Sequence, residues 1–180
     1  MLETLALLGR TMGFSFAAGI NLYATVAILG LAKRFGWVEL PQQFAVFDND
    51  VVIGVALVLY AIEFVADKVP WVDSVWDAVH TVVRPIGGAV LAVTTLGDAS
   101  PTVTGLIALL GGALATGTHL TKAGTRAAAN TSPEPFSNWA LSLGEDVFVI
   151  GLSALALSYP LAAGLVVILG VVVMAAFAAW

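Results

Sequence analysis

The sequence predicts an all-α integral membrane protein, a polytopic bundle of about six transmembrane helices. Of its 180 residues, 59% are hydrophobic and 11% are charged, whereas roughly a quarter of the residues are charged in a soluble domain. Several uncharged runs approach the roughly 20 residues that cross the hydrocarbon core as a helix. Because no polar segment is longer than a loop, we expect residues 1–180 to form a single membrane domain.

The first two predicted spans both contain polar residues. Residues 12–32 form an uncharged run whose middle, AAGINLY, contains Asn21. This motif fits either a close-packing surface or a local break in the helix. After a polar loop, residues 51–66 form a second span, which carries Glu63 too deep in the helix for a simple end cap.

The next segment, 71–84, has a helical period of apolar residues between Pro70 and Pro85. Its polar residues fall within about 60° of one another on the helix; they are Asp73, Asp77, His80 and Arg84. We expect this stripe to face a polar cavity or another helix, the alternative being an amphipathic helix on the membrane surface. Residues 86–97 are too short to cross alone. They either re-enter or continue the helix across a proline kink, and we favour the kinked crossing.

Three more spans complete the chain. They cover residues 102–121, 139–158 and 160–180, with turn residues at 131–138. The small residues of 102–121 are typical of helix packing, and this helix is a candidate contact in a homo-oligomer. The same order of features occurs at 51–97 and again at 102–158: a span, a basic residue, a proline-containing linker and a helix with acids. This repeat is the pattern of a weak internal duplication.

The distribution of charge predicts the topology and excludes some partners. On this layout one side carries most of the Lys and Arg residues, namely Arg10, Lys68, Arg84, Lys122 and Arg126. The positive-inside rule then places both termini in the cytoplasm of a multi-pass protein of the inner (plasma) membrane. A net charge of -5 argues against a nucleic-acid partner. The absence of Cys excludes thiolate metal sites and cysteine nucleophiles.

Ionisable side chains within apolar helices are the candidate functional residues, because a charge near the membrane centre costs at least about 2.5 kcal/mol on insertion scales. The structural alternative is that these residues form interhelical ion pairs or snorkel from helix ends. Taken one at a time, four of them can be explained in this way: Asp67, Lys68, Lys122 and Arg126. The residues predicted to form a polar path or ligand-binding site are Asn21, Glu63, Asp73, Asp77, His80, Arg84, His119, Lys122, Arg126, Glu145 and Asp146.

Four blocks of the sequence carry a resemblance to a known family. They are GINLY at 19–23, EFVADKVPWVDSVWDAVHTVVRP at 63–85, HLTKAGTRAAANTSPEPFSN at 119–138 and SLGED at 142–146. Through them the chain resembles a family of small bacterial integral membrane proteins catalogued as a domain of unknown function. The resemblance covers nearly the whole chain and implies a polytopic helical membrane protein, without implying an activity.

Two functional hypotheses follow from the residues, and we favour transport over catalysis. In the first, carboxylates and histidines form a path for protons or small cations through a helical bundle, with a small ion or small molecule as substrate and no cofactor. In the second, a membrane-embedded enzyme acts on a lipid or lipid-linked phosphate. Its divalent metal would be held by Asp77 and His80, at i and i+3, with Glu63 or Glu145 from a neighbouring helix. Lys122 and Arg126 would bind the phosphate. A structural or accessory subunit is the third alternative.

Overall fold

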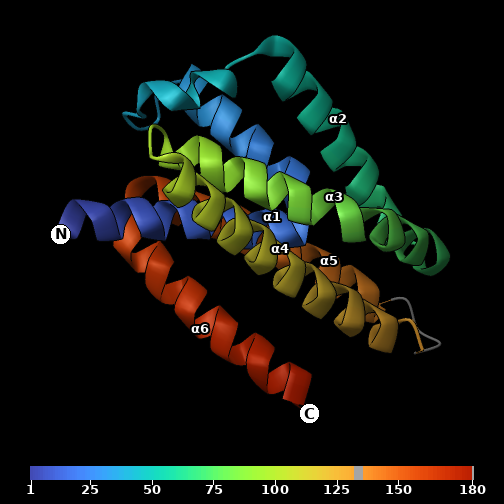
Figure 1. The fold of residues 1–180 in the computed structure, drawn as a ribbon. Coiled ribbons are helices and arrows are strands. Elements are labelled where there is room, and N and C mark those ends of the chain that lie inside the picture. The colour runs from blue at the N-terminus through green and yellow to red at the C-terminus, as the bar shows by residue number, and fades with distance from the viewer. Residues whose placement is uncertain (132–135, 180) are drawn as a thin grey trace.

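The computed structural model describes residues 1–131 and 136–179 as a bundle of six α-helices (Figure 1). They are α1 (Leu2–Arg34), α2 (Asp50–Ala66), α3 (Pro70–Leu96), α4 (Pro101–Ala129), α5 (Phe136–Ser158) and α6 (Pro160–Ala179), with a short 3-10 helix, η1 (Gln42–Val46), before α2. The predicted all-α bundle is confirmed. Within the described residues, α1 and α3 to α6 are each long and apolar enough to cross a membrane. Most of the turn predicted at 131–138 lies outside the described residues.

Helix α1 is two half-helices that meet at Asn21, where the backbone leaves helical geometry (φ -147°, ψ 98°). Gly9 in the first half lies against Pro160 at the start of α6, and Gly30 in the second half lies against Ile53 at the start of α2. Both ends of α1 therefore lie at one end of the bundle, and its bend lies inside (Figure 1). The predicted span at 12–32 thus contains the local break that its AAGINLY motif allowed.

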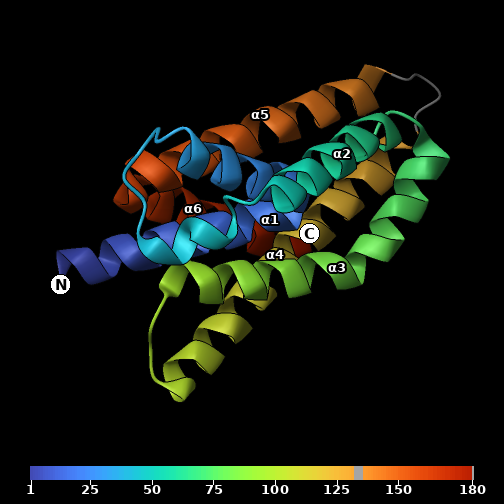
Figure 2. The same ribbon diagram turned by 90° about the horizontal axis from the view of Figure 1, so that it is seen from above.

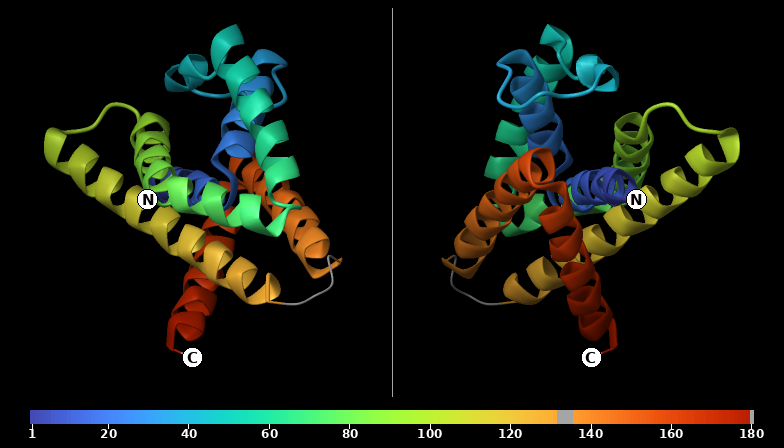
Figure 3. Two further views of the ribbon diagram at one scale, coloured as in Figure 1. Left: turned by 90° about the vertical axis from the view of Figure 1, so that its right-hand side faces the viewer. Right: turned by 90° about the vertical axis from the view of Figure 1, so that its left-hand side faces the viewer.

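Small residues let α1 occupy the centre of the bundle. Gly13 packs against Ala156 of α5 and Ala163 of α6, and Gly19 lies against the backbone of Ala115 in α4. A side chain at Gly19 would overlap that backbone, so this position requires glycine. Helix α1 consequently contacts every other helix, whereas α6 is mostly exposed and diverges from the bundle toward the C-terminus (Figure 3).

Helix α3 runs without interruption from Pro70 through Pro85 to Leu96. Pro70 suits the first turn of a helix because it has no N–H to leave unpaired. Pro85 lies within the helix, which is bent along its length (Figure 2), as expected where proline removes a helical hydrogen bond. Residues 86–97 therefore continue the amphipathic segment, as the kinked-crossing hypothesis predicted.

Small residues also join α3 to α4. Gly88 lies against Ala115, and Gly111 lies against Ala92 and the carbonyl of Gly88. Gly111 of α4 is thus covered by α3 of the same chain. A contact between copies through 102–121 stays a prediction.

The two chain ends lie at opposite ends of the bundle. Arg10 donates hydrogen bonds to the carbonyls of Ala156 and Leu157, near the α5–α6 turn. Phe177, near the C-terminus, packs beside Gly124 in the last part of α4. The expectation that both termini share the cytoplasmic side assumed that α1 crosses as one helix. That expectation stays a prediction; because α1 turns back at Asn21, we set beside it the opposite prediction, that the two termini lie on opposite sides of the membrane.

Candidate functional site

The polar stripe of α3 is buried in the protein, as predicted. Asp73, Asp77, His80 and Arg84 are all buried, whereas Val75, Val79 and Val82 on the same helix are exposed. The surface-helix alternative is therefore excluded for this stripe. The bend of α1, the last turns of α2, the second half of α4 and the first half of α5 cover it, and these elements supply the other polar residues.

Arg84 of α3 joins four helices. Its Nη2 donates to Glu63 Oε1 of α2 at 2.6 Å, and its Nη1 lies 2.7 Å from His119 Nδ1 of α4. The same Nη1 reaches Asp77 Oδ1 and the carbonyl of Gly19, both at 3.4 Å. The side chains of Arg84 and Glu63 are fully buried. Arg84 therefore forms an ion pair with Glu63 through Nη2, and its Nη1 serves the other three acceptors.

The contacts of His119 fix its tautomer. Because the arginine donates to Nδ1, that nitrogen must be the acceptor and the proton must be on Nε2. Nε2 lies 3.0 Å from Thr81 Oγ1, whose hydroxyl donates to the carbonyl of Asp77. His119 is thus a neutral imidazole that connects Arg84 to Thr81.

Lys122 and Arg126, one turn apart on α4, bind the remaining carboxylates. Lys122 Nζ lies 3.1 Å from Asp67 Oδ2, 3.3 Å from Glu63 Oε1 and 3.6 Å from Glu145 Oε2. Arg126 donates to both oxygens of Glu145, at 3.1 and 2.6 Å, and to Asp67 Oδ2 at 3.0 Å. We call the connected group the polar cluster; it comprises Glu63, Asp67, Asp77, Arg84, His119, Lys122, Arg126 and Glu145.

The bend of α1 is tied directly to this cluster. Its first half ends with carbonyl groups that lack helical partners, and Arg84 and Lys122 donate to the carbonyls of Gly19 and Ile20. Positive charge is favourable at a helix C-terminus. Asn21 caps the second half, because its Oδ1 accepts from the Ala24 amide at 2.9 Å. The break is therefore stabilised by cations from α3 and α4.

Two further acids lie beside the polar cluster. Asp146 accepts a hydrogen bond from Asn21 Nδ2 at 3.3 Å, and Asp73 accepts one from Asn130 Nδ2 at 3.2 Å. Neither acid has an ion pair within 1–131 and 136–179. In the same residues, four buried carboxylate oxygens have no hydrogen-bond partner: Glu63 Oε2, Asp67 Oδ1, Asp73 Oδ1 and Asp146 Oδ2.

Lys68, in the turn between α2 and α3, is a further base beside the site. Its Nζ lies 3.1 Å from the centre of the Phe64 ring and donates to Ser142 Oγ at 3.3 Å. Burial lowers the pKa of the Lys68 ammonium. With Lys68 included, six acids face four bases, so carboxylates are in excess in this half of the bundle.

The residues predicted to bind a metal are not brought together. Asp77 contacts Arg84, and Glu145 is paired with Arg126. His80 Nδ1 donates to the carbonyl of Trp76 at 2.7 Å, which leaves Nε2 to accept from the Tyr23 hydroxyl at 2.9 Å. No group of three His, Asp or Glu side chains close enough to hold a metal occurs among the described residues.

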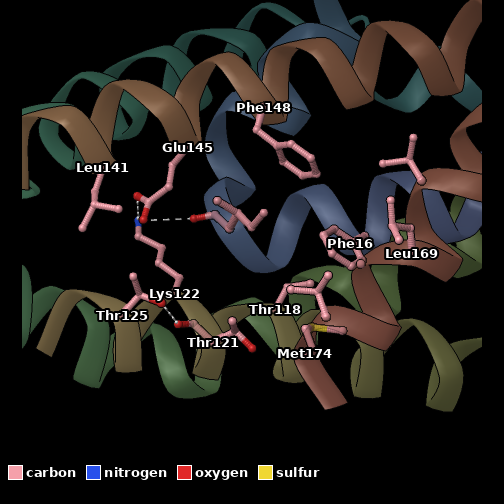
Figure 4. A pocket seen from close by; sticks show the side chains of 14 residues that line it. Phe16, Thr118, Thr121, Lys122, Thr125, Leu141, Glu145, Phe148, Leu169 and Met174 are labelled. Atoms are coloured by element: carbon pink, nitrogen blue, oxygen red, sulfur yellow. Dashed lines mark hydrogen bonds and ion pairs between the residues drawn. The ribbon is translucent and has the colours of Figure 1, made fainter. Parts of the chain in front are cut away.

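Two cavities flank the polar cluster. A polar one of about 250 Å³ lies between α3 and α4 and is lined by Asp73, Asp77 and Arg126. A larger one of about 420 Å³ lies between α1, α4, α5 and α6. Figure 4 shows Lys122 and Glu145 meeting at one end of this second cavity, with Phe16, Phe148 and Leu169 along its walls. The ion pairs thus separate a polar cavity from an apolar one.

Asp67 is the site residue that the sequence analysis missed. It was explained as a helix-end residue, but its side chain is buried between Lys122 and Arg126. A signal was present, because Glu63 and Asp67 are one turn apart and so share a face of α2. Tyr23, which contacts His80, did carry a signal, because it places a phenol group inside the AAGINLY motif, which fits packing and a site equally well. Thr81, which contacts His119, carries no comparable signal.

Comparison with known proteins supports the resemblance seen in the sequence. The family model described as "Domain of unknown function (DUF4126)" matches residues 8–180. The chain belongs to this family. No curated protein and no solved structure matches the chain. The match to DUF4126 includes all of the polar cluster and the bend of α1, so the site lies within the family domain.

Proposed function

We propose that this DUF4126 protein is a membrane transporter that moves protons or small cations through the polar cluster. The observation that carries the proposal is the buried excess of carboxylates, six acids against four bases, gathered around a broken helix. An uncompensated charge is costly in the membrane interior. A proton or a metal cation would remove the excess, and four unpartnered carboxylate oxygens offer places to accept it.

The bend of α1 supports transport over a purely structural role. Interrupted helices near the bilayer midplane, with free carbonyl groups and ionisable residues around the break, are the usual way in which secondary transporters build ion sites. Here Arg84 and Lys122 bind both the carbonyls of the bend and the carboxylate of Glu63. Protonation of Glu63 would weaken its hold on both cations, so the charge state of the cluster is linked to the bend.

The packing favours a transporter over an open channel. On one side of the bend the polar cavity reaches Asp73 and Asn130, near the turn that follows α4. On the other side the helices meet through Gly9, Gly13 and Gly88 in close contact with neighbouring backbone and alanine atoms. The path is thus polar at one end and tightly packed at the other, which suits access from one side at a time.

The metal-dependent enzyme is less well supported. Binding of a lipid phosphate by Lys122 and Arg126 would require free donors, but both side chains are engaged by Asp67 and Glu145. The same carboxylates would have to leave these cations in order to hold a metal. The arrangement therefore suits ion exchange within the network better than anion binding.

The test is a flux measurement on the purified protein in liposomes that enclose a pH-sensitive dye. A potassium gradient with valinomycin drives protons inward. Na⁺ or K⁺ gradients across the same vesicles without valinomycin test whether these cations are exchanged for protons. Glu63→Gln keeps the shape of the side chain but removes its titration, so flux should fall at least tenfold while the protein stays folded. Glu39→Gln, an exposed acid in the α1–α2 loop, is the matched control and should keep full flux.

The result also discriminates the alternatives. A structural role predicts that Glu63→Gln lowers thermal stability in detergent and leaves any flux per folded molecule unchanged. Absence of proton and cation flux from the unmodified protein would refute the transport proposal outright.

A further inference from the structure

The cavity between α1, α4, α5 and α6 has an apolar body and a polar end. Its volume of about 420 Å³ is within the range of about 300–1,000 Å³ that holds a small organic ligand. Phe16, Phe148, Leu169 and Met174 form its walls, and Lys122 and Glu145 lie at one end (Figure 4). An occupant must therefore be mostly apolar, with one polar group directed at α4 and α5.

The donors at the polar end are already used within the protein. Lys122 has three N–H groups, and its Nζ contacts Glu63, Asp67 and the carbonyl of Ile20, all within 3.3 Å. The hydroxyls of Thr121 and Thr125 donate to the carbonyls one turn earlier, at 2.9 and 2.8 Å. Each of these threonine oxygens keeps lone pairs but has no hydrogen to offer.

Glu145 provides the strongest acceptor. Its carboxylate takes hydrogen bonds from Arg126 on both oxygens, yet two carboxylate oxygens offer about four acceptor positions. Its side chain is 16% exposed, compared with 3% for Asp67 and none for Glu63, so it is the ion-paired acid most open to the cavity. The polar end thus lacks donors and is rich in acceptors.

We propose that this cavity binds an amphipathic organic cation with N–H groups, a primary alkyl- or arylalkylammonium ion. The ammonium group donates to Glu145 and the threonine oxygens, while the apolar body lies against the wall formed by Phe16 and Phe148, whose rings pack on each other with centres 6.1 Å apart. The inference rests on the transport function proposed above and names its substrate class: the ammonium ion is exchanged for the proton or cation held by the polar cluster.

The experiment is a scintillation-proximity binding assay on the purified protein with tritiated 4-phenylbutylammonium. Competitors are 4-phenylbutanol, which has a similar size but no charge, and 4-phenylbutyrate, an anion. We expect saturable binding that the two competitors displace at least tenfold less well than unlabelled 4-phenylbutylammonium. Equal displacement by the alcohol would overturn the proposal and indicate an apolar or lipid-chain site.

Variants test the location of the site. Glu145→Gln should weaken binding of the probe at least tenfold. Leu169→Trp, on the cavity wall and distant from the ion pairs, should abolish binding by filling the space. Val172→Trp is the matched control, since Val172 is as exposed as Leu169 on the same helix but does not line the cavity, and it should bind as the unmodified protein does. Full binding by Leu169→Trp would refute the cavity assignment, even if Glu145→Gln fails to fold.

Flux in liposomes separates this inference from the proposed function. Proton or cation flux without ammonium binding would overturn the substrate class alone. Ammonium binding without any flux would refute the transport function, and with it the exchange of ammonium for a proton or cation. The protein would then be an ammonium-binding protein.

Discussion

Replacement of Arg84 by Met should destabilise the protein more than any other single loss of charge. Arg84 is fully buried and supplies the shortest hydrogen bond to Glu63, as well as bonds to Asp77, His119 and the carbonyl of Gly19. Methionine has a similar length and fills the space with apolar atoms. The change therefore removes the charge and its donors without opening a large cavity.

The expected loss of stability depends on which cations remain beside the acids once Arg84 is replaced. Removal of one partner from a buried ion pair costs about 3–5 kcal/mol, because the other charge is left uncompensated. Glu63 would retain Lys122 at 3.3 Å, so we expect the lower end, about 3 kcal/mol. Glu63→Gln in the same protein removes the stranded charge. The double variant should recover part of the loss, with a coupling of about 1–3 kcal/mol between the two positions.

The measurement is equilibrium unfolding of the purified protein in mixed micelles at increasing dodecyl sulfate. Arg34→Met is the control, since Arg34 pairs with Asp48 and Asp50 at the exposed end of α1, where an ion pair contributes little. The reasoning would fail if Arg84→Met were no more destabilising than Arg34→Met. It would also fail if the losses of the double variant were simply additive.

Three further outcomes follow from the bend of α1. Gly19→Ala should prevent folding, because its methyl group would overlap Thr118 and the backbone of Ala115, whereas Gly105→Ala, with open space around it, should be neutral; yield of folded protein on size-exclusion chromatography decides this. Asn21→Ala removes the cap of the second half-helix and should lower the unfolding free energy by about 1 kcal/mol in the same dodecyl sulfate titration; unchanged stability would contradict the capping role. Topology reporters fused to the two termini should report opposite sides of the membrane, and the same side for both would show that α1 crosses as one helix.

The parts of the structure that depend on local pattern were predictable from the sequence. The stripe of α3 has a helical period between two prolines, and an ionised stripe in an apolar helix has to be buried against protein. The sequence therefore indicated both the helix and the environment of Asp73, Asp77, His80 and Arg84, although not the partners of each side chain.

The bend of α1 and the role of Asp67 depend on residues distant in the chain. Whether a helix breaks at Asn21 is decided by Arg84 and Lys122, which bind the carbonyls freed by the break. Asp67 is next to Lys68 and near Pro70, as helix-end residues often are. It pairs with two buried cations, Lys122 and Arg126, only because α4 packs against the end of α2. No local pattern encodes such contacts, so the sequence left them open.

The spacing of the ion pairs along the chain bears on how the protein is made. Glu63 is followed by its principal partner, Arg84, after 21 residues, so both charges leave the ribosome within one helical hairpin. Lys122 follows 59 residues after Glu63 and can enter the lipid only by joining a hairpin that already carries unpaired acids. Because an unpaired charge resists insertion, α2 and α3 should leave the translocon together, and α4 should be released only once it can dock against them. Because α1 contacts every later helix, it can complete its packing only after α6 has been synthesised. We therefore expect the last steps of assembly to be post-translational.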